Sequence, residues 1–202
     1  MSDVEKFILD PACGGRMMWI NKKHPNVLYC DIRTAEVGHI KNSKHSIKPD
    51  LLIDFRKMPF DDCSFKLVVY DPPHVINLNK SSIMWRKYGG LVAETWQSDI
   101  KKGFDECWRV LEDYGILILK WNDKSINFKE LLVVIDKEPL FHNRIRKKNT
   151  LGHNTYWATF MKIPDYKKRV RELPHTGVLD MIIERKKEHI KKLEEELAEL
   201  TA

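Results

Sequence analysis

The sequence contains only four cysteines, and their spacing fits neither a metal site nor a disulfide framework. Cys13, Cys30, Cys63 and Cys107 are scattered singly along 202 residues, with no CxxC pair. Structural zinc sites need clustered ligands, and small secreted domains carry closely spaced, paired cysteines. We therefore expect reduced thiols, a cytoplasmic protein and no bound metal.

Long apolar runs and targeting signals are absent as well. No segment approaches the roughly 20 consecutive apolar residues that cross a bilayer. The first ten residues, MSDVEKFILD, lack the basic-then-apolar layout of a secretory signal peptide. We expect a globular chain that does not use a membrane.

The common glycine-rich nucleotide fingerprints are missing. Neither GxGxxG nor GxxxxGK[ST] occurs, which disfavours a dinucleotide-binding domain of that type and a P-loop NTPase. The chain has an excess of positive charge, with 35 Lys and Arg against 29 Asp and Glu and a formal net charge of +6. This balance weakly favours a polyanionic partner such as nucleic acid.

Apolar strand-like runs alternate with helical patterns over the first 163 residues. The strand-like runs are 6–10, 26–31, 51–54, 66–70, 114–120, 141–146 and 155–163, and the helical patterns are 16–23, 98–112 and 127–136. Continuous apolar strands between helices are typical of a mostly parallel sheet with helices on both faces, and the last two runs predict an antiparallel hairpin. We expect one α/β domain over residues 1–165.

Residues 166–202 have a different pattern, which predicts a linker followed by a coiled-coil-like helix. Seven positions alternate by four and three: Leu179, Ile183, Lys186, Ile190, Leu193, Leu197 and Leu200. Such a seam favours a helix that pairs two chains into a homodimer. Packing of this helix on its own domain is the alternative.

Four successive strand-like runs end on an acid. These acids are Asp10, Asp31, Asp54 and Asp71, and the first is followed by the glycine turn of DPACGG. In an open parallel sheet, ligands bind beyond the carboxyl ends of the strands, and glycines there let the backbone approach a ligand closely. Each acid alone could be a helix cap or turn residue, but four together predict a binding site at one edge of the sheet.

DPACGG, CD, IDF and DPPH in this order resemble the class I S-adenosylmethionine-dependent methyltransferases. More narrowly, they are similar to the amino-methyltransferases with a [DNS]PP[YFW] motif, chiefly DNA adenine methylases. The resemblance covers about residues 7–163. It implies a Rossmann-like fold with a seven-stranded sheet, S-adenosylmethionine as cofactor, and methyl transfer to an exocyclic amino nitrogen.

The resemblance also implies a role for individual positions. Asp31 would accept hydrogen bonds from the ribose hydroxyls of the cofactor, and Asp54 from its adenine amino group. The complete cofactor set would be Asp10, Ala12, Cys13, Gly14, Asp31, Ile32, Asp54 and Phe55.

The DPPH motif would form the catalytic site. A carboxylate on Asp71 and the carbonyl of Pro72 would accept from the same amino group and hold its nitrogen towards the methyl donor, while Pro73 keeps the turn rigid. His74 stands where the family has Tyr, Phe or Trp. An imidazole can still stack on a base, and it can also take or give a proton.

Aromatic and basic residues elsewhere predict contacts with the substrate. Residues 75–97 read as a loop over the site that carries Trp85, Arg86, Lys87 and Tyr88, and Trp121 follows the fifth strand. Such groups suit bases and phosphates. The basic run 144–148 could also contact phosphate, although an ordinary solvated surface explains it as well.

Three functions remain open on the sequence alone. The first is an amino-methyltransferase acting on nucleic acid, with adenine in DNA placed before other targets. The second is a methyltransferase for RNA, protein or a small molecule, because the chain has no room for a target-recognition domain. The third is a non-catalytic interaction protein that retains the fold.

Overall fold

The computed structural model describes residues 5–146 and 153–164, with a few helical residues nearer the C-terminus: Lys186, Lys187, Ile190, Lys191, Glu194, Glu195 and Ala198. The chain divides into two compact units, Met1–Lys162 and Ile163–Ala202. Of the predicted heptad seam, only Lys186 and Ile190 are described, and the other five positions lie outside the described residues. The pairing of two chains through this seam therefore stays a prediction. No helix in the described part of the chain is long and apolar enough to cross a membrane.

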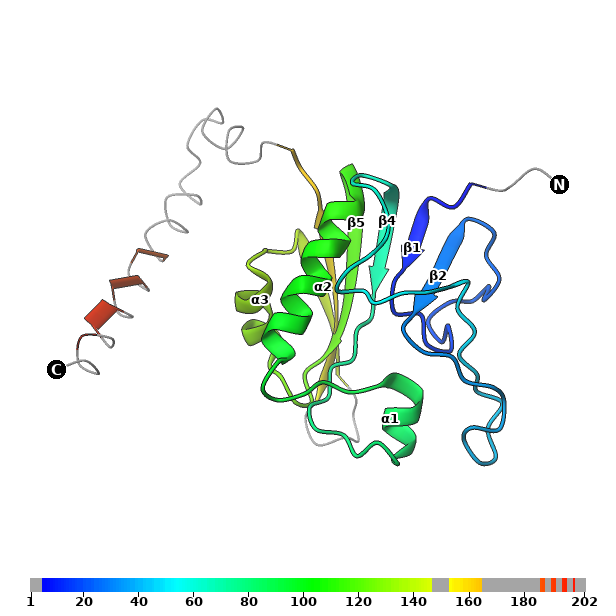
Figure 1. The fold of residues 1–202 in the computed structure, drawn as a ribbon. Coiled ribbons are helices and arrows are strands. Elements are labelled where there is room, and N and C mark those ends of the chain that lie inside the picture. The colour runs from blue at the N-terminus through cyan, green and yellow to red at the C-terminus, as the bar shows by residue number, and fades with distance from the viewer. Residues whose placement is uncertain are drawn as a thin grey trace. The chain divides into compact units, whose positions relative to one another are not determined.

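Seven strands form one mixed sheet (Figure 1) in the order β3-β2-β1-β4-β5-β7-β6. The neighbours from β3 to β5 pair in parallel, whereas β7 is antiparallel to both β5 and β6, so the predicted closing hairpin is confirmed. The strands are β1 Ile8–Asp10, β2 Val27–Asp31, β3 Leu51–Leu52, β4 Phe65–Tyr70, β5 Leu111–Asn122, β6 Phe141–Arg146 and β7 Asn154–Met161.

The helices that pack on the sheet lie on one face of it, and the prediction of helices on both faces is wrong for the described residues. Helix α2, Trp96–Val110, contacts β4, β5 and helix α3, Phe128–Ile135. Their buried side chains share one core with Leu117, Leu119 and Phe160. Helix α1, Ile83–Tyr88, has no buried residue.

On the opposite face, turns replace the helix expected at residues 16–23. Arg16 has a φ of 54°, which a helix does not accommodate. Its guanidinium donates to the carbonyl oxygens of Lys22 and Lys48 and pairs with Asp50. These bonds hold the chain in turns. Trp19 from this segment packs edge-on against a strand ring, Tyr29, so the segment covers this face of β1 and β2.

Farther along the opposite face, four apolar side chains of β4, β5 and β7 are only half-buried. Leu67 pairs in register with Ile116, and Ile116 with Met161, while Ile118 follows two positions later on the same face. All four are half-buried, and none belongs to the core shared by α2 and α3. The sheet is therefore more open on this side of the described domain.

A glycine in α2 fixes how closely this helix approaches the sheet. A Cβ added at Gly103 would overlap the Tyr70 hydroxyl and come within 2.5 Å of the Phe55 ring. Both neighbours are rigid aromatic side chains. The Tyr70 hydroxyl is buried and has no hydrogen-bond partner in the described part of the chain.

We therefore expect Gly103→Ala to destabilise the protein, by about 1–3 kcal/mol, because overpacking outweighs the better helix propensity of alanine. Urea unfolding measures this change. Lys102→Ala, at an exposed position on the same helix, is the control and should stay within about 0.5 kcal/mol of the parent. Equal stability of the two variants would contradict the close packing described.

Candidate active site

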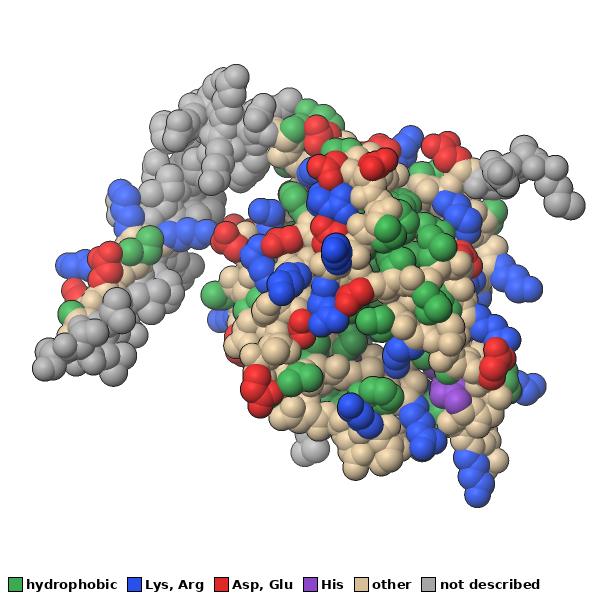
Figure 2. Space-filling model, in the orientation of Figure 1, with side chains coloured by type: hydrophobic (Ala, Val, Ile, Leu, Met, Phe, Trp, Pro, Cys, Tyr) green, Lys and Arg blue, Asp and Glu red, His purple; other side chains and the backbone are tan. Residues whose placement is uncertain are grey.

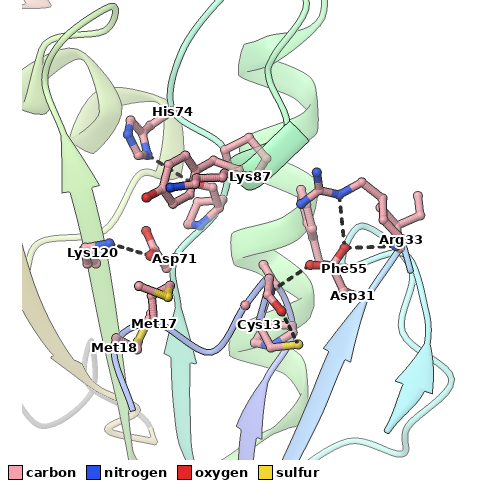
Figure 3. A pocket seen from close by; sticks show the side chains of 18 of the residues that line it. Cys13, Met17, Met18, Asp31, Arg33, Phe55, Asp71, His74, Lys87 and Lys120 are labelled. Carbon is pink, nitrogen blue, oxygen red and sulfur yellow. Dashed lines mark hydrogen bonds and ion pairs between the residues drawn. The ribbon is translucent and has the colours of Figure 1, made fainter. Parts of the chain in front are cut away.

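A cavity of about 250 Å³ lies where the parallel strands end, and the close-up in Figure 3 shows the side chains around it. Its walls come from the loop after β1, the end of β2, the segment after β4, the last residues of α1, and β5 and β7. The lining residues are Pro11, Ala12, Cys13, Gly14, Gly15, Met17, Met18, Asp31, Ile32, Arg33, Phe55, Asp71, Pro72, Pro73, His74, Lys87, Tyr88, Lys120 and Trp157.

The glycine turn after β1 is tied to the end of β2. Gly14 has a φ of 48°, and its backbone N–H donates to Asp31 Oδ2 at 2.9 Å. Just before it, the N–H of Cys13 donates to the carbonyl oxygen of Cys30 at 2.8 Å. A left-handed conformation favours glycine, which explains this residue at the turn. The two bonds fix the loop as one wall of the cavity.

Asp31 is almost fully buried at the end of β2. Its Oδ1 accepts from the backbone N–H and the Nε of Arg33, at 2.9 and 3.3 Å. Arg33 also donates through Nη1 to the carbonyl oxygen of Trp85, which links β2 to α1. The neighbouring Ile32 is 55% exposed and lines the cavity, so it presents an apolar surface to a ligand. A carboxylate oxygen can accept more than one bond, so Asp31 Oδ2 can still serve a hydroxyl.

On the far side of the cavity, Asp71 forms an ion pair with Lys120. The Nζ of Lys120 lies 2.5 Å from Asp71 Oδ2, as Figure 3 shows. Lys120 pairs in register with Trp157 of β7, and its ammonium lies 5.9 Å from the centre of that ring. Within the described residues, no hydrogen bond reaches Asp71 Oδ1, so this oxygen can accept from a ligand.

His74 turns back onto its own motif. Its Nδ1 lies 3.3 Å from the carbonyl oxygen of Pro72. A carbonyl only accepts, so this contact requires the proton on Nδ1 and leaves Nε2 with a lone pair. Burial lowers the pKa of His74, with the nearby Asp71 opposing that effect. The ring packs edge-on against Trp121, with centroids 6.0 Å apart.

The structure brings most of the predicted site residues together in this cavity. Five do not line it: Asp10 lies beneath it, and Asp54, Trp85, Arg86 and Trp121 lie outside its lining. The Asp54 carboxylate is paired with Arg56, and Trp121 is fully buried, with its Nε1 donating to the carbonyl oxygen of Ile126. In α1, Trp85 and Arg86 lie outside the cavity lining, whereas Lys87 and Tyr88 line it.

These placements bear on two predictions. Asp54 does not line this cavity, and Arg56 contacts both of its oxygens, so its role as an acceptor for the cofactor stays a prediction. Trp121 is a core residue that supports His74 and is not a substrate contact. The segment 75–97 contains α1 and the start of α2, so it is not only a loop. The basic run begins on exposed β6 with Arg144, and its positions 147 and 148 lie outside the described residues.

Sequence reasoning missed Lys120, Arg33 and Trp157. Lys120 had a visible signal, because a lone cation near the end of the apolar run GILILK lies at the same edge as Asp71. Arg33 and Trp157 had none, since nothing local distinguishes them from surface residues.

Asp10 lies beneath the cavity and is fully buried. Its Oδ2 accepts from Trp19 Nε1 at 2.7 Å, and its Oδ1 from the backbone N–H of Ala12 at 3.3 Å. The pKa of Asp10 is raised from 3.8 to about 7, chiefly by burial and also by the charges of Asp71 and Asp31, against the hydrogen bonds from Trp19 and Ala12. The three carboxylates at this edge therefore interact.

This pKa predicts a pH-dependent contribution to stability. The folded protein holds a proton on Asp10 that the unfolded chain releases near pH 4, so the contribution is complete below pH 4 and is lost as the pH rises through 7. The loss is up to about 1.4 kcal/mol per pH unit in this window. Unfolding free energies of the parent and of Asp10→Asn at pH 5, 6, 7 and 8 measure it. Their difference should change with pH, and parallel curves would refute the assignment.

Comparisons with known proteins support the fold but identify no relative by sequence. No family model matches the chain, and no curated protein matches it. A S-adenosylmethionine-dependent methyltransferase from Methanosarcina mazei aligns at 12% identity and a TM-score of 0.50, over 81% of this chain and 94% of that one. Geranyl diphosphate C-methyltransferase from Streptomyces coelicolor, in complex with S-adenosylhomocysteine, aligns at 10% identity and 0.50, over 79% and 71%.

A third structure with the same fold is described as a [4+2]-cyclase, SpnF, and aligns at 12% identity and a TM-score of 0.50, over 80% of this chain and 76% of that one. Similarity at such identities shows the fold alone. The chain therefore has the Rossmann-like fold of the class I methyltransferases, and its reaction has to be argued from its own residues.

Proposed function

We propose that this chain binds S-adenosylmethionine in the cavity and transfers its methyl group to an exocyclic amino nitrogen of a nucleic-acid base, adenine in DNA first. The observation that carries the proposal is the position of two carboxylates on opposite walls of one cavity, Asp31 beside the glycine turn and Asp71 in the DPPH motif. The first suits a ribose diol and the second suits an amine.

The residues present fit this cofactor. The cavity, at about 250 Å³, is slightly smaller than the roughly 300–1,000 Å³ of small-molecule sites. Asp31 Oδ2 can accept a ribose hydroxyl, and the exposed Ile32 offers an apolar surface for a purine. The Gly14 turn lets the backbone come close to the rest of the molecule. When bound, the cofactor supplies an electrophilic methyl group on a sulfonium.

The DPPH residues suit the acceptor amine. Asp71 Oδ1 is available to accept one N–H, and the Pro72 carbonyl oxygen has a second lone pair beside its contact with His74. Two acceptors on one amino group fix the direction of its nitrogen lone pair, which is what in-line transfer needs. His74 Nε2 has a lone pair and can take the proton that the amine loses.

One observation favours a second candidate, a methyltransferase for an anionic small molecule. Lys120 places a cation in the cavity wall next to Asp71. An ammonium there would also pair with a carboxylate or phosphate of a compact substrate.

A labelled-cofactor experiment separates these candidates. The folded protein is incubated with methyl-labelled S-adenosylmethionine and, in parallel, with DNA, with RNA and with a small-molecule extract. Label in DNA supports the proposal, and label only in the extract favours the second candidate. Binding of S-adenosylmethionine without transfer to any acceptor would leave the interaction protein as the better account.

A further inference from the structure

A second cavity, of about 620 Å³, lies beside the first and shares Gly14, Gly15, Met17 and Lys87 with it. Its walls are the turns after β1, the loop after β2 and the end of α1. The remaining lining residues are Arg16, Lys22, Lys23, Ser43, Lys44, His45, Ser46 and Lys48. We call it the basic cleft, because six of its twelve lining residues are Lys or Arg and none is Asp or Glu.

The walls of the basic cleft are held in place by specific contacts. Arg16 reaches across it, donating to the carbonyl oxygens of Lys22 and Lys48, while its guanidinium stacks on Tyr29 at 3.8 Å. The charge of Arg16 is paired with Asp50, so Arg16 holds the cleft walls together and its charge is not available to a ligand. The cleft lies where a helix over residues 16–23 was expected.

The loop after β2 is equally well fixed. Ala35 and Ile47 exchange two backbone hydrogen bonds, of 2.9 and 2.8 Å, and Ile47 is buried. The ring of His45 lies against the glycine turn, since a Cβ added at Gly15 would come within 2.5 Å of His45 Nε2. A side chain at position 15 would therefore require the His45 ring to move.

Most lysines of the basic cleft are not neutralised by a nearby acid, so their positive charge is available to an anionic ligand. Lys48 pairs with Glu36, but Lys22, Lys23, Lys44 and Lys87 have no ion pair with an acid among the described residues. Lysines on an ordinary solvated surface alternate with acids, as the near balance of 35 cations and 29 acids over the chain would give. Figure 2 shows Lys and Arg side chains gathered at the lower right, over the loops beside β2, with few acids among them.

The electrostatics of a neighbouring group agree with this picture. Burial lowers the pKa of His45, and the positive charges of His39, Lys87, Arg33 and Lys22 lower it further. The cleft therefore has a positive potential. The cofactor has only one carboxylate, so four available ammonium groups exceed what its binding needs.

We infer that the basic cleft binds the phosphodiester backbone of a nucleic-acid strand whose target base enters the adjoining cavity. Lys22 and Lys23 from the first turn, Lys44 from the second loop and Lys87 from α1 contact successive phosphates. This inference rests on the proposed function and deepens it, since it names the surface that would bind the nucleic-acid substrate. It also gives the described domain a surface that can hold a polymer.

The test is a binding measurement that needs no catalysis. Fluorescein-labelled 20-mers of single-stranded DNA, of RNA of the same sequence and of duplex DNA are titrated with the full chain, and anisotropy is read at several salt concentrations. The cleft variant is Lys22→Gln, Lys23→Gln and Lys44→Gln combined. The control variant, Lys66→Gln, Lys102→Gln and Lys129→Gln combined, changes the net charge equally at exposed positions that line neither cavity.

The cleft variant should lose roughly tenfold or more in affinity, and its dependence of log K on log salt should be shallower by about 2–3, since each phosphate contact contributes roughly 0.7–0.9. The control variant should behave like the parent. The arm with the tightest binding names the nucleic acid. Equal losses in both variants, or no loss in either, would overturn the inference.

Two further readouts separate this inference from the proposed function. The cleft variant should keep its affinity for S-adenosylmethionine, because none of its three lysines lines the first cavity. Oligonucleotide binding through the cleft without any methyl transfer would refute the proposed function and keep the cleft. Methyl transfer to a polynucleotide at equal rates by parent and cleft variant would refute the cleft alone.

Discussion

Asp71→Ala should lower methyl transfer by at least about 100- to 1,000-fold and leave S-adenosylmethionine affinity nearly unchanged. Asp71 Oδ1 is the one carboxylate oxygen of the DPPH motif available to an amine, and its bond to the amine strengthens as charge develops on the nitrogen. A loss in turnover with intact cofactor binding is the signature of such a residue. Single-turnover transfer and calorimetry on the same preparation measure the two quantities.

The ion pair with Lys120 needs its own control. Asp71→Ala leaves an ammonium without its partner in a partly buried site, which can itself disturb the cavity. Combining it with Lys120→Met removes that charge. If Asp71 acts directly on the amine, the double variant stays inactive. Recovery of near-parent turnover in the double variant would show that the unpaired lysine, and not the lost carboxylate, caused the defect.

Asp31→Ala should weaken S-adenosylmethionine binding by about 1.5–3 kcal/mol, or roughly 10- to 150-fold. The carboxylate would lose its bonds to the ribose, and the Gly14 turn would lose the bond that fixes it. Calorimetry measures the change directly.

Asp54→Ala is the matched control for this prediction. It removes another acid that follows a parallel strand, but one that the structure pairs with Arg56 outside the cavity. Its effect on cofactor affinity should stay within about 0.5 kcal/mol. Equal weakening by the two variants would mean that Asp54 contacts the cofactor, as the family resemblance implied, and would contradict the geometry.

The binding edge could be predicted from sequence because strand periodicity and parallel pairing are local signals with a fixed geometric consequence. Runs such as KLVVY are apolar on both faces, and parallel strands point their carboxyl ends to one edge. Asp10, Asp31 and Asp71 therefore had to lie near one another, and the mutual effect of their charges on Asp10 agrees.

Side-chain partners could not be predicted in the same way. Asp54 pairs with Arg56, which is only two positions away. Arg56 also pairs with Asp99, which is 43 positions away in the chain. Whether Arg56 turns towards the cavity or towards α2 depends on packing that no local pattern contains.

The prediction of a helix at residues 16–23 was wrong for a similar reason. The apolar residues of this segment do not share one buried face, because Trp19 donates a hydrogen bond to the buried Asp10, while Ile20 is fully exposed. Tertiary bonds of Trp19 and Arg16 outweighed a weak helix preference. The turns that replace this helix line the basic cleft, so the cleft could not be predicted from the sequence.

Identification of the methylated product tests the central claim most directly. DNA treated with the protein and labelled S-adenosylmethionine is digested to nucleosides, and the labelled nucleoside is identified by mass spectrometry. We predict a methyl group on an exocyclic amino nitrogen, adenine N6 first, that is absent with Asp71→Ala. A methyl group on carbon or oxygen, or no product from folded protein that binds the cofactor, would contradict the account.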